Sequence, residues 1–204
     1  MNNTKIQYCD YSWNITSGCT DEFPCWEFCW ARKMANRLRG RCGYDATEPF
    51  KPTFHAERLD EPLRMQKPKR IAVSFMGDLF HKDVPWQWQA DVLSTALRAY
   101  RLHGHTFLFL TKRPENMANT VRTWLETGDF RKFRREIPNG FWFGTSVGSQ
   151  ADADLRLPDL LKCPGNLWVS CEPMQGLVVF KPEWLKRIGW LVAGGGPFPV
   201  HPQW

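Results

Sequence analysis

The chain has 204 residues, enough for one domain of ordinary size with a core that needs no disulfides. Its 27 Lys and Arg against 21 Asp and Glu give a net charge of +6, which favours an anionic partner without identifying it. No apolar run approaches the roughly 20 residues of a membrane span, and the first residues lack the pattern of a signal peptide. These features exclude a membrane protein and a disulfide-stabilised secreted protein, and we expect a cytoplasmic one.

Buried strands and amphipathic helices alternate along the chain. Strands are predicted, in chain order, at residues 11–15, 70–76, 105–110, 140–145, 166–170 and 189–193. Helices are predicted between them, for example at 31–38 and at 86–102, where Val92, Leu93 and Ala96 fall on one face. This alternation is typical of a parallel sheet covered by helices, either as an open sheet or as a barrel. We therefore expect a single α/β domain over residues 1–204.

Polar or glycine-rich segments follow the predicted strands directly. They occupy residues 77–81, 111–114, 146–150, 171–173 and 194–196. The carboxyl ends of parallel strands meet at one edge of a sheet, where binding and catalytic groups collect. The alternative is that these residues only form the turns between strands and helices. Because turns do not require Asp, Lys, Arg or Glu, we favour convergence on a functional site.

Three of the seven cysteines lie close together, after the first predicted strand and before the first predicted helix. Cys19, Cys25 and Cys29 have the spacing C-x5-C-x3-C. Three thiolates can hold three irons of a four-iron cluster, which leaves the fourth iron open to a cofactor. A closed zinc site is the main alternative, with a fourth ligand from Cys9, Cys42 or His55. A third interpretation is that the cysteines are buried or redox-active without a metal.

The cysteine segment resembles the radical S-adenosylmethionine superfamily, whose signature is C-x3-C-x-aromatic-C in the loop after the first barrel strand. Phe28 stands at the aromatic position before Cys29. The whole chain resembles an uncharacterised family, found often in phages and prophages, that is related to radical enzymes of the spore photoproduct lyase kind. The matching segments are residues 11–14, 18–20, 29–31, 55–59, 76–81, 110–114, 170–173 and 201–204.

This resemblance implies a partial (β/α)6 barrel of the TIM type with parallel strands, a [4Fe-4S] cluster and S-adenosylmethionine. It also implies a reductant such as a flavodoxin or ferredoxin, and a location in the cytoplasm, that of the host if a phage encodes the protein. Two features depart from the family pattern: the spacing of the cysteines, and the end of the chain at Trp204, from which we expect a shortened barrel.

The resemblance also assigns residues to the cofactor. Gly77 and Asp78 stand where the superfamily holds the cofactor's amino group, although Asp78 is also placed to cap a helix. Lys112 and Arg113 are assigned to the cofactor's carboxylate or to a substrate phosphate, with a solvated turn as the alternative. Ser146 and Gln150 are assigned to the cofactor's ribose. Gly194 and Gly195 are assigned to a close approach of the backbone to the cofactor, which glycine allows.

Two residues after the fifth strand are the candidates for catalysis. Glu172 is a candidate catalytic carboxylate, and the alternative is that it forms a buried ion pair with Arg113 or Lys112. Cys171 is the candidate hydrogen donor. Among the five histidines we single out His81, three residues after Asp78.

The leading hypothesis is an enzyme that abstracts hydrogen from a nucleobase or nucleic acid, a substrate class that the net charge and the many aromatic residues also favour. The alternative is a non-catalytic cluster-binding protein, such as a phage regulator or a nucleic-acid-binding protein.

Overall fold

The computed structural model describes residues 1–20, 22, 26–127 and 136–194 of the chain. The chain forms two compact units, Met1–Leu110 and Thr111–Trp204. Both are mixed α/β, with parallel strands connected through helices. None of the helices in the described part is long and apolar enough to cross a membrane.

The main sheet of the first unit is parallel except at its edge. β2 (Tyr11–Trp13) pairs in parallel with β5 (Arg70–Val73), which pairs in parallel with β6 (Thr106–Thr111). The short β1 (Asn2–Asn3) adds to β2 in the antiparallel direction. Ile71, Ala72 and Val73 are buried, as expected for strands that are covered on both faces.

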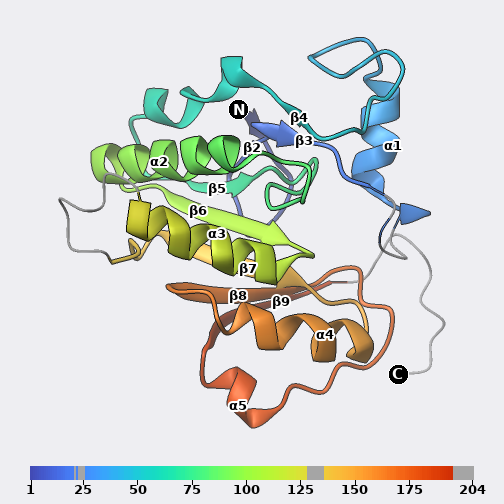
Figure 1. Ribbon diagram of the computed structural model, residues 1–204, viewed down its shortest axis with the longest axis vertical. Coiled ribbons are helices and arrows are strands. Elements are labelled where there is room, and N and C mark those ends of the chain that lie inside the picture. Colours follow the sequence, from blue (N-terminus) through green and yellow to red (C-terminus); the bar gives the residue numbers. More distant parts are fainter. Residues whose placement is uncertain (21, 23–25, 128–135, 195–204) are drawn as a thin grey trace. The chain divides into compact units, whose positions relative to one another are not determined.

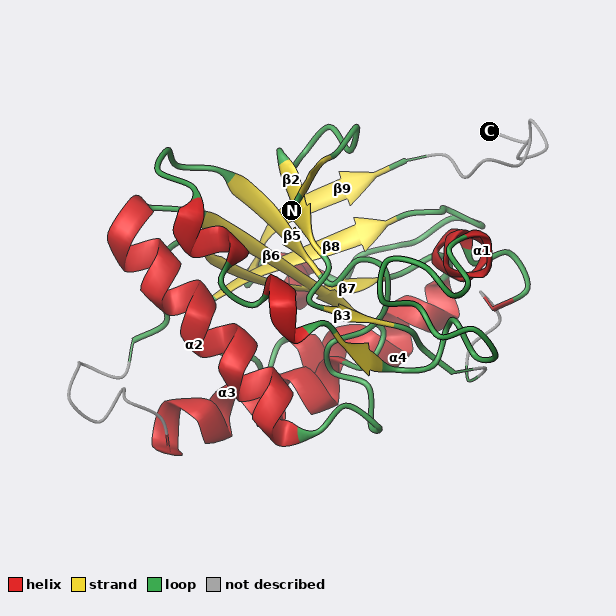
Figure 2. Ribbon diagram, turned by 90° about the horizontal axis from the view of Figure 1, so that it is seen from above, coloured by secondary structure: helices red, strands yellow, loops and turns green. Residues whose placement is uncertain are grey.

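Two α-helices lie among the described residues of this unit. α2 (Trp86–His103) lies along β5 and β6 in both views (Figures 1 and 2) and buries Val92, Leu93 and Ala96. α1 (Trp30–Arg37) is shorter and lies away from α2 (Figure 2), with Ala31 and Ala35 buried. The apolar positions recur at helical spacing, so burial of one face explains why both segments are helical.

A second, two-stranded sheet brings together segments that are far apart in sequence. β3 (Thr16–Ser17) pairs antiparallel with β4 (Thr53–Phe54). Two 3-10 helices follow, η2 (Ala56–Arg58) and η3 (Glu61–Arg64). The chain between β2 and α1 is therefore held against the segment that precedes β5.

Within residues 111–127 and 136–194, the second unit contains three parallel strands and three α-helices. β7 (Phe141–Ser146) pairs with β8 (Asn166–Cys171), and β8 pairs with β9 (Ile188–Ala193). The helices are α3 (Pro114–Thr127), α4 (Gln150–Leu160) and the short α5 (Pro182–Leu185). In chain order, α4 connects β7 to β8, and α5 is part of the connection from β8 to β9. Both helices are coloured orange to red in Figure 1.

Both faces of these three strands carry a stacked aromatic pair. On one face the ring of Phe141 stacks with Trp124 of α3, with 6.3 Å between ring centroids. On the other face Trp168 stacks with Trp190 of β9, at 5.5 Å. Because side chains alternate along a strand, Ser170 shares the face of Trp168, and Cys171 shares the face of Val169.

The predicted strands are confirmed, with bounds that differ by a few residues. The burial predicted for the last strand is wrong, because the residues of β9 alternate between half-buried and exposed. The largest difference in bounds is at β5, which ends at Val73 rather than at Met76 because Ser74 adopts a positive φ of 57°. The predicted helices at 31–38 and 86–102 are also confirmed. β1 and the β3–β4 pair were not predicted.

Candidate functional site

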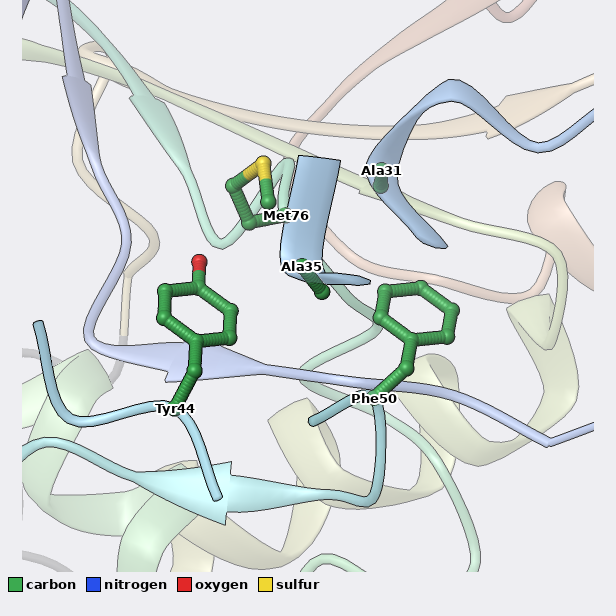
Figure 3. Packing of buried hydrophobic residues seen from close by; sticks show 5 residues of the cluster. All are labelled: Ala31, Ala35, Tyr44, Phe50 and Met76. Carbon is green, nitrogen blue, oxygen red and sulfur yellow. The ribbon is translucent and has the colours of Figure 1, made fainter. Parts of the chain in front are cut away.

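Cys19 and Cys29 lie at the two ends of the segment that connects β3 to α1. Cys29 is the N-cap residue of α1, and its side chain makes no capping hydrogen bond. Both cysteines pack against the same buried cluster, formed by Ala31, Ala35, Tyr44, Phe50 and Met76 and drawn in Figure 3. The third cysteine of the motif, Cys25, lies outside the described residues.

The cluster surrounds the cysteines with apolar and aromatic side chains. Ala31 and Ala35 come from α1, and Tyr44 and Phe50 come from the segment between α1 and β4 (Figure 3). Trp26 packs against it, with 5.8 Å between its ring centroid and that of Phe50. Such surroundings keep water from thiolate ligands and influence the potential of a metal centre.

Two glycines explain how Cys19 reaches this position. Gly18 and Gly77 form a parallel bridge, in which the Gly18 N–H donates to the Met76 carbonyl at 3.1 Å and the Asp78 N–H donates to the Gly18 carbonyl at 3.2 Å. A Cβ at Gly77 would lie 2.5 Å from the Gly18 nitrogen, and Gly18 has a φ of 95°. The structure therefore gives Gly77 a packing role, since only glycine allows the two chains to approach so closely.

A buried histidine holds the chain just before Cys19. The Nε2 of His55 lies 2.7 Å from the Ser17 hydroxyl, and the His55 ring is 2% exposed. Burial, together with the nearby Arg58 guanidinium, lowers the pKa of His55 from 6.5 to about 4. His55 is therefore neutral at physiological pH and acts as a hydrogen-bonding partner of β3.

A second buried histidine holds the chain just after Cys19. The Asp83 N–H donates to Nδ1 of His81 at 3.1 Å. Nδ1 is thus an acceptor, so the proton is on Nε2, which donates to the Thr20 hydroxyl at 2.7 Å. Sequence reasoning selected His81, but only for its closeness to Asp78, and it missed Ser17, Thr20 and His55 as residues that orient the cysteine segment.

Asp78 is buried in the turn that follows the Gly77 bridge. Its Oδ1 accepts a hydrogen bond from the Phe80 N–H at 3.0 Å. The next helix, α2, begins only at Trp86, so the alternative in which Asp78 caps a helix is wrong. Its carboxylate stabilises a turn instead, close to the segment that carries Cys19.

The fit of this segment to a metal rests on its donor chemistry. Across residues 1–20, 22, 26–127 and 136–194, no three His, Cys, Asp or Glu side chains are grouped to hold a metal ion. Two thiols of the motif nevertheless pack on one cluster, and the third falls among residues 23–25. Thiols in apolar surroundings fit an iron-sulfur cluster better than a hard cation such as Mg²⁺.

Two of the three residues that the sequence suggested as a fourth zinc ligand, His55 and Cys9, have other surroundings. His55 is already bonded to Ser17. Cys9 is buried beside β2, and this burial, with the neighbouring Asp10 charge, raises the pKa of its thiol to about 11. A thiol with that pKa is protonated at neutral pH.

In the second unit, the ends of the three strands meet as the sequence predicted. Ser146 pairs with Ser170 across β7 and β8. Beyond β8, Glu172 is half-buried, and its Oε2 accepts a hydrogen bond from the Ser170 hydroxyl at 3.4 Å. A Cβ at Gly194, just after β9, would collide with the Glu172 carboxylate. Ser146, Glu172 and Gly194 therefore lie at one edge of this sheet.

Other candidates of the second unit have structural partners. Oε1 of Gln150 accepts a hydrogen bond from the Val179 N–H at 2.7 Å, which fastens the loop after β8 to α4. Arg113 is buried and directly precedes α3 in the chain. Its backbone N–H donates a hydrogen bond to the Thr111 hydroxyl at 2.9 Å. Lys112 is half-buried in the same turn. Gly195 lies outside the described residues.

Cys171 is poorly suited to act together with Glu172. Ser170 and Glu172 are hydrogen-bonded to each other, whereas Cys171 belongs to the opposite face of β8 by strand alternation. The thiol is 1% exposed, and burial together with the charge of Glu172 raises its pKa. These features are those of a core cysteine.

A protein-family model matches residues 3–204, almost the whole chain. The chain belongs to this family, which is described as a protein of unknown function (DUF5131). No curated protein and no solved structure matches the chain. The site of this DUF5131 member must therefore be interpreted from its own residues.

Proposed function

We propose that this protein is an iron-sulfur enzyme of the radical S-adenosylmethionine type, in which Cys19, Cys25 and Cys29 hold a [4Fe-4S] cluster. The observation that supports the proposal most strongly is that Cys19 and Cys29 pack on one buried aromatic cluster. When bound and reduced by a flavodoxin or ferredoxin, the cluster would supply one electron to cleave the cofactor, so that hydrogen can be abstracted from a substrate.

The residues of the first unit have distinct tasks in this proposal. The Gly18–Gly77 bridge and the bonds from His55 and His81 hold the cysteine segment in place. Asp78, which already accepts the Phe80 N–H, offers its carboxylate to the cofactor's amino group. Trp26 and Phe50 exclude water from the thiolates.

In the second unit, the polar groups after β6, β7, β8 and β9 are assigned to the cofactor and substrate. Glu172 binds a hydroxyl or ammonium group, and Gly194 provides room for its carboxylate. Lys112 and Arg113 provide positive charge for a carboxylate or phosphate. The finer form of the fold, a partial (β/α)6 barrel in a cytoplasmic protein, is part of the same proposal, which the parallel strands of both units support.

Anaerobic reconstitution with iron and sulfide tests the cluster. We expect about four irons per chain and thiolate-to-iron absorption, with most of the iron lost in Cys19→Ser, Cys25→Ser and Cys29→Ser. Cys42→Ser is the matched control, since Cys42 is exposed and lies outside the motif. Elemental analysis that finds zinc and no iron would establish the zinc-binding alternative instead.

Chromatography after reduction with dithionite tests the chemistry. The loaded protein should release 5′-deoxyadenosine and methionine from S-adenosylmethionine. A stable cluster whose electron-spin spectrum does not respond to the cofactor would rule out the enzyme and leave the non-catalytic cluster-binding protein.

A further inference from the structure

Helix α1 and the turn that follows it form the most basic segment of the chain. Five cations lie within ten residues, at Arg32, Lys33, Arg37, Arg39 and Arg41. Residues 28–44 contain no Asp or Glu. Since the whole chain has a net charge of +6, most of its excess positive charge is concentrated here. The Arg32 guanidinium lies over the Trp26 ring, 4.6 Å from its centroid, and faces away from Trp30. We call the other four cations, together with Trp30 and Met34, the α1 surface.

The guanidinium groups of Arg39 and Arg41 bond to carbonyl oxygens, which leave the positive charge of these two residues in place. Nη1 of Arg39 donates to the carbonyl oxygens of Ala46 and Thr47, both at 3.2 Å. Nη2 of Arg41 donates to the Arg37 carbonyl. Carbonyl groups satisfy guanidinium donors without cancelling the charge, so these bonds orient the cations while the surface stays attractive to anions.

Two large apolar side chains are exposed among these cations. Trp30 is 56% exposed and Met34 38% exposed, one helical turn apart on α1. Lys33 and Arg37 lie on the same side of the helix by the i, i+3 and i+7 spacing from Trp30. An exposed tryptophan next to several cations suits a ligand that combines negative charge with flat rings.

We infer that the α1 surface binds a single-stranded nucleic acid, with the cations on its phosphates and Trp30 stacked on an unpaired base. Charge complementarity identifies the partner as a polyanion, and the exposed indole selects a strand whose bases are unstacked. A duplex offers phosphates but no free base faces. The inference rests on the proposed function, because it specifies where the nucleic-acid substrate is held.

The place of the α1 surface agrees with this role. Trp30 directly follows Cys29, one of the proposed cluster ligands, and α1 starts at that point. Figure 1 shows α1 next to the segment that leads from β3, on the side of the first unit away from α2. A strand bound along α1 would therefore pass close to the cysteine segment.

Fluorescence anisotropy with a labelled single-stranded DNA of about 20 nucleotides tests the inference, measured over a range of KCl concentrations. Lys33→Gln combined with Arg37→Gln should make the negative slope of log affinity against log salt less steep by about 1.4, since each phosphate contact on a single strand contributes about −0.7. Trp30→Ala should weaken binding about five- to 150-fold and leave that slope unchanged.

Matched controls separate the α1 surface from general surface effects. Arg98→Gln with Arg101→Gln removes two exposed cations from α2, and Trp86→Ala removes another exposed tryptophan, 39% exposed. Both controls should bind like the wild type, and thermal unfolding should confirm that every variant is folded. Equal effects of the α1 variants and their controls, or tighter binding of the duplex form of the same DNA, would overturn the inference.

Two experimental outcomes distinguish a failure of this inference from a failure of the proposed function. A reconstituted protein that cleaves S-adenosylmethionine but does not bind the DNA keeps the enzyme and disproves the nucleic-acid surface. Binding that depends on Trp30 in a protein that never takes up iron supports the surface and disproves the cluster.

Discussion

The two ring nitrogens of His81 have different partners, so two amide substitutions can separate their effects. Gln at this position reaches the place of Nε2 and keeps a donor for Thr20, whereas Asn reaches only the place of Nδ1 and keeps an acceptor for the Asp83 N–H. If His81 orients Cys19 through Thr20, His81→Asn should increase the rate of Cys19 alkylation severalfold, and His81→Gln should remain near the wild type.

Mass spectrometry after pulsed alkylation measures this prediction, with Cys42 as the internal reference because it is already exposed. The opposite order, with Cys19 more reactive in His81→Gln than in His81→Asn, would mean that His81 stabilises only the turn at Asp83 and does not orient Cys19. Thr20→Val should resemble His81→Asn, and the double variant should add little, since both remove the same hydrogen bond.

At the scale of elements, the Gly18–Gly77 bridge determines where the cysteine segment lies. Gly77→Ala places a Cβ against the backbone of Gly18 and Ser17, at distances of 2.5 to 2.7 Å. We expect a loss of about 1 to 3 kcal/mol in the free energy of unfolding, measured by urea denaturation, together with reduced iron uptake. Gly176→Ala is the control, because no atom lies within 4 Å of its added Cβ. A Gly77→Ala protein as stable as Gly176→Ala would contradict the packing role.

The elements also show what the sequence could and could not predict. The strands from β5 to β8 were predictable because each is a continuous and mostly buried apolar run. β9 was found from the same apolar pattern, although its residues alternate between half-buried and exposed. β3 and β4 have two residues each, too few for any periodicity. The Ser17–His55 bond joins residues 38 positions apart, and only the folded chain brings such polar partners together. The strand-end groups were predicted for the same topological reason as the sheet, but the use of Gln150 to fasten a loop was not.

For the molecule as a whole, the neutral state of His55 makes stability depend on pH. Unfolded His55 takes up a proton near its ordinary pKa of 6.5, whereas the folded residue stays neutral down to about pH 4. Between these values the unfolded state binds more protons, so the free energy of unfolding should fall by up to about 3 kcal/mol as pH is lowered, and this contribution is fully present above about pH 7.

His55→Gln isolates this contribution, because the amide can still bond to Ser17 but does not titrate. Urea unfolding followed by tryptophan fluorescence should show that the stability advantage of the wild type over His55→Gln shrinks from about pH 7 to about pH 4. A difference that does not change with pH would show that His55 is not held neutral by its burial.

The start of α1 at Cys29 has a thermodynamic consequence for the whole molecule. The N-cap side chain forms no capping bond of its own, so a metal bound to its sulfur would order the first turn of the helix that carries Trp30. Two ligands that depend on one helix must influence each other reciprocally. The factor by which the cluster raises the affinity for a nucleic acid must equal the factor by which the nucleic acid raises the affinity for the cluster. At equilibrium, the protein should therefore bind its cluster more tightly when the nucleic acid is present than when it is absent.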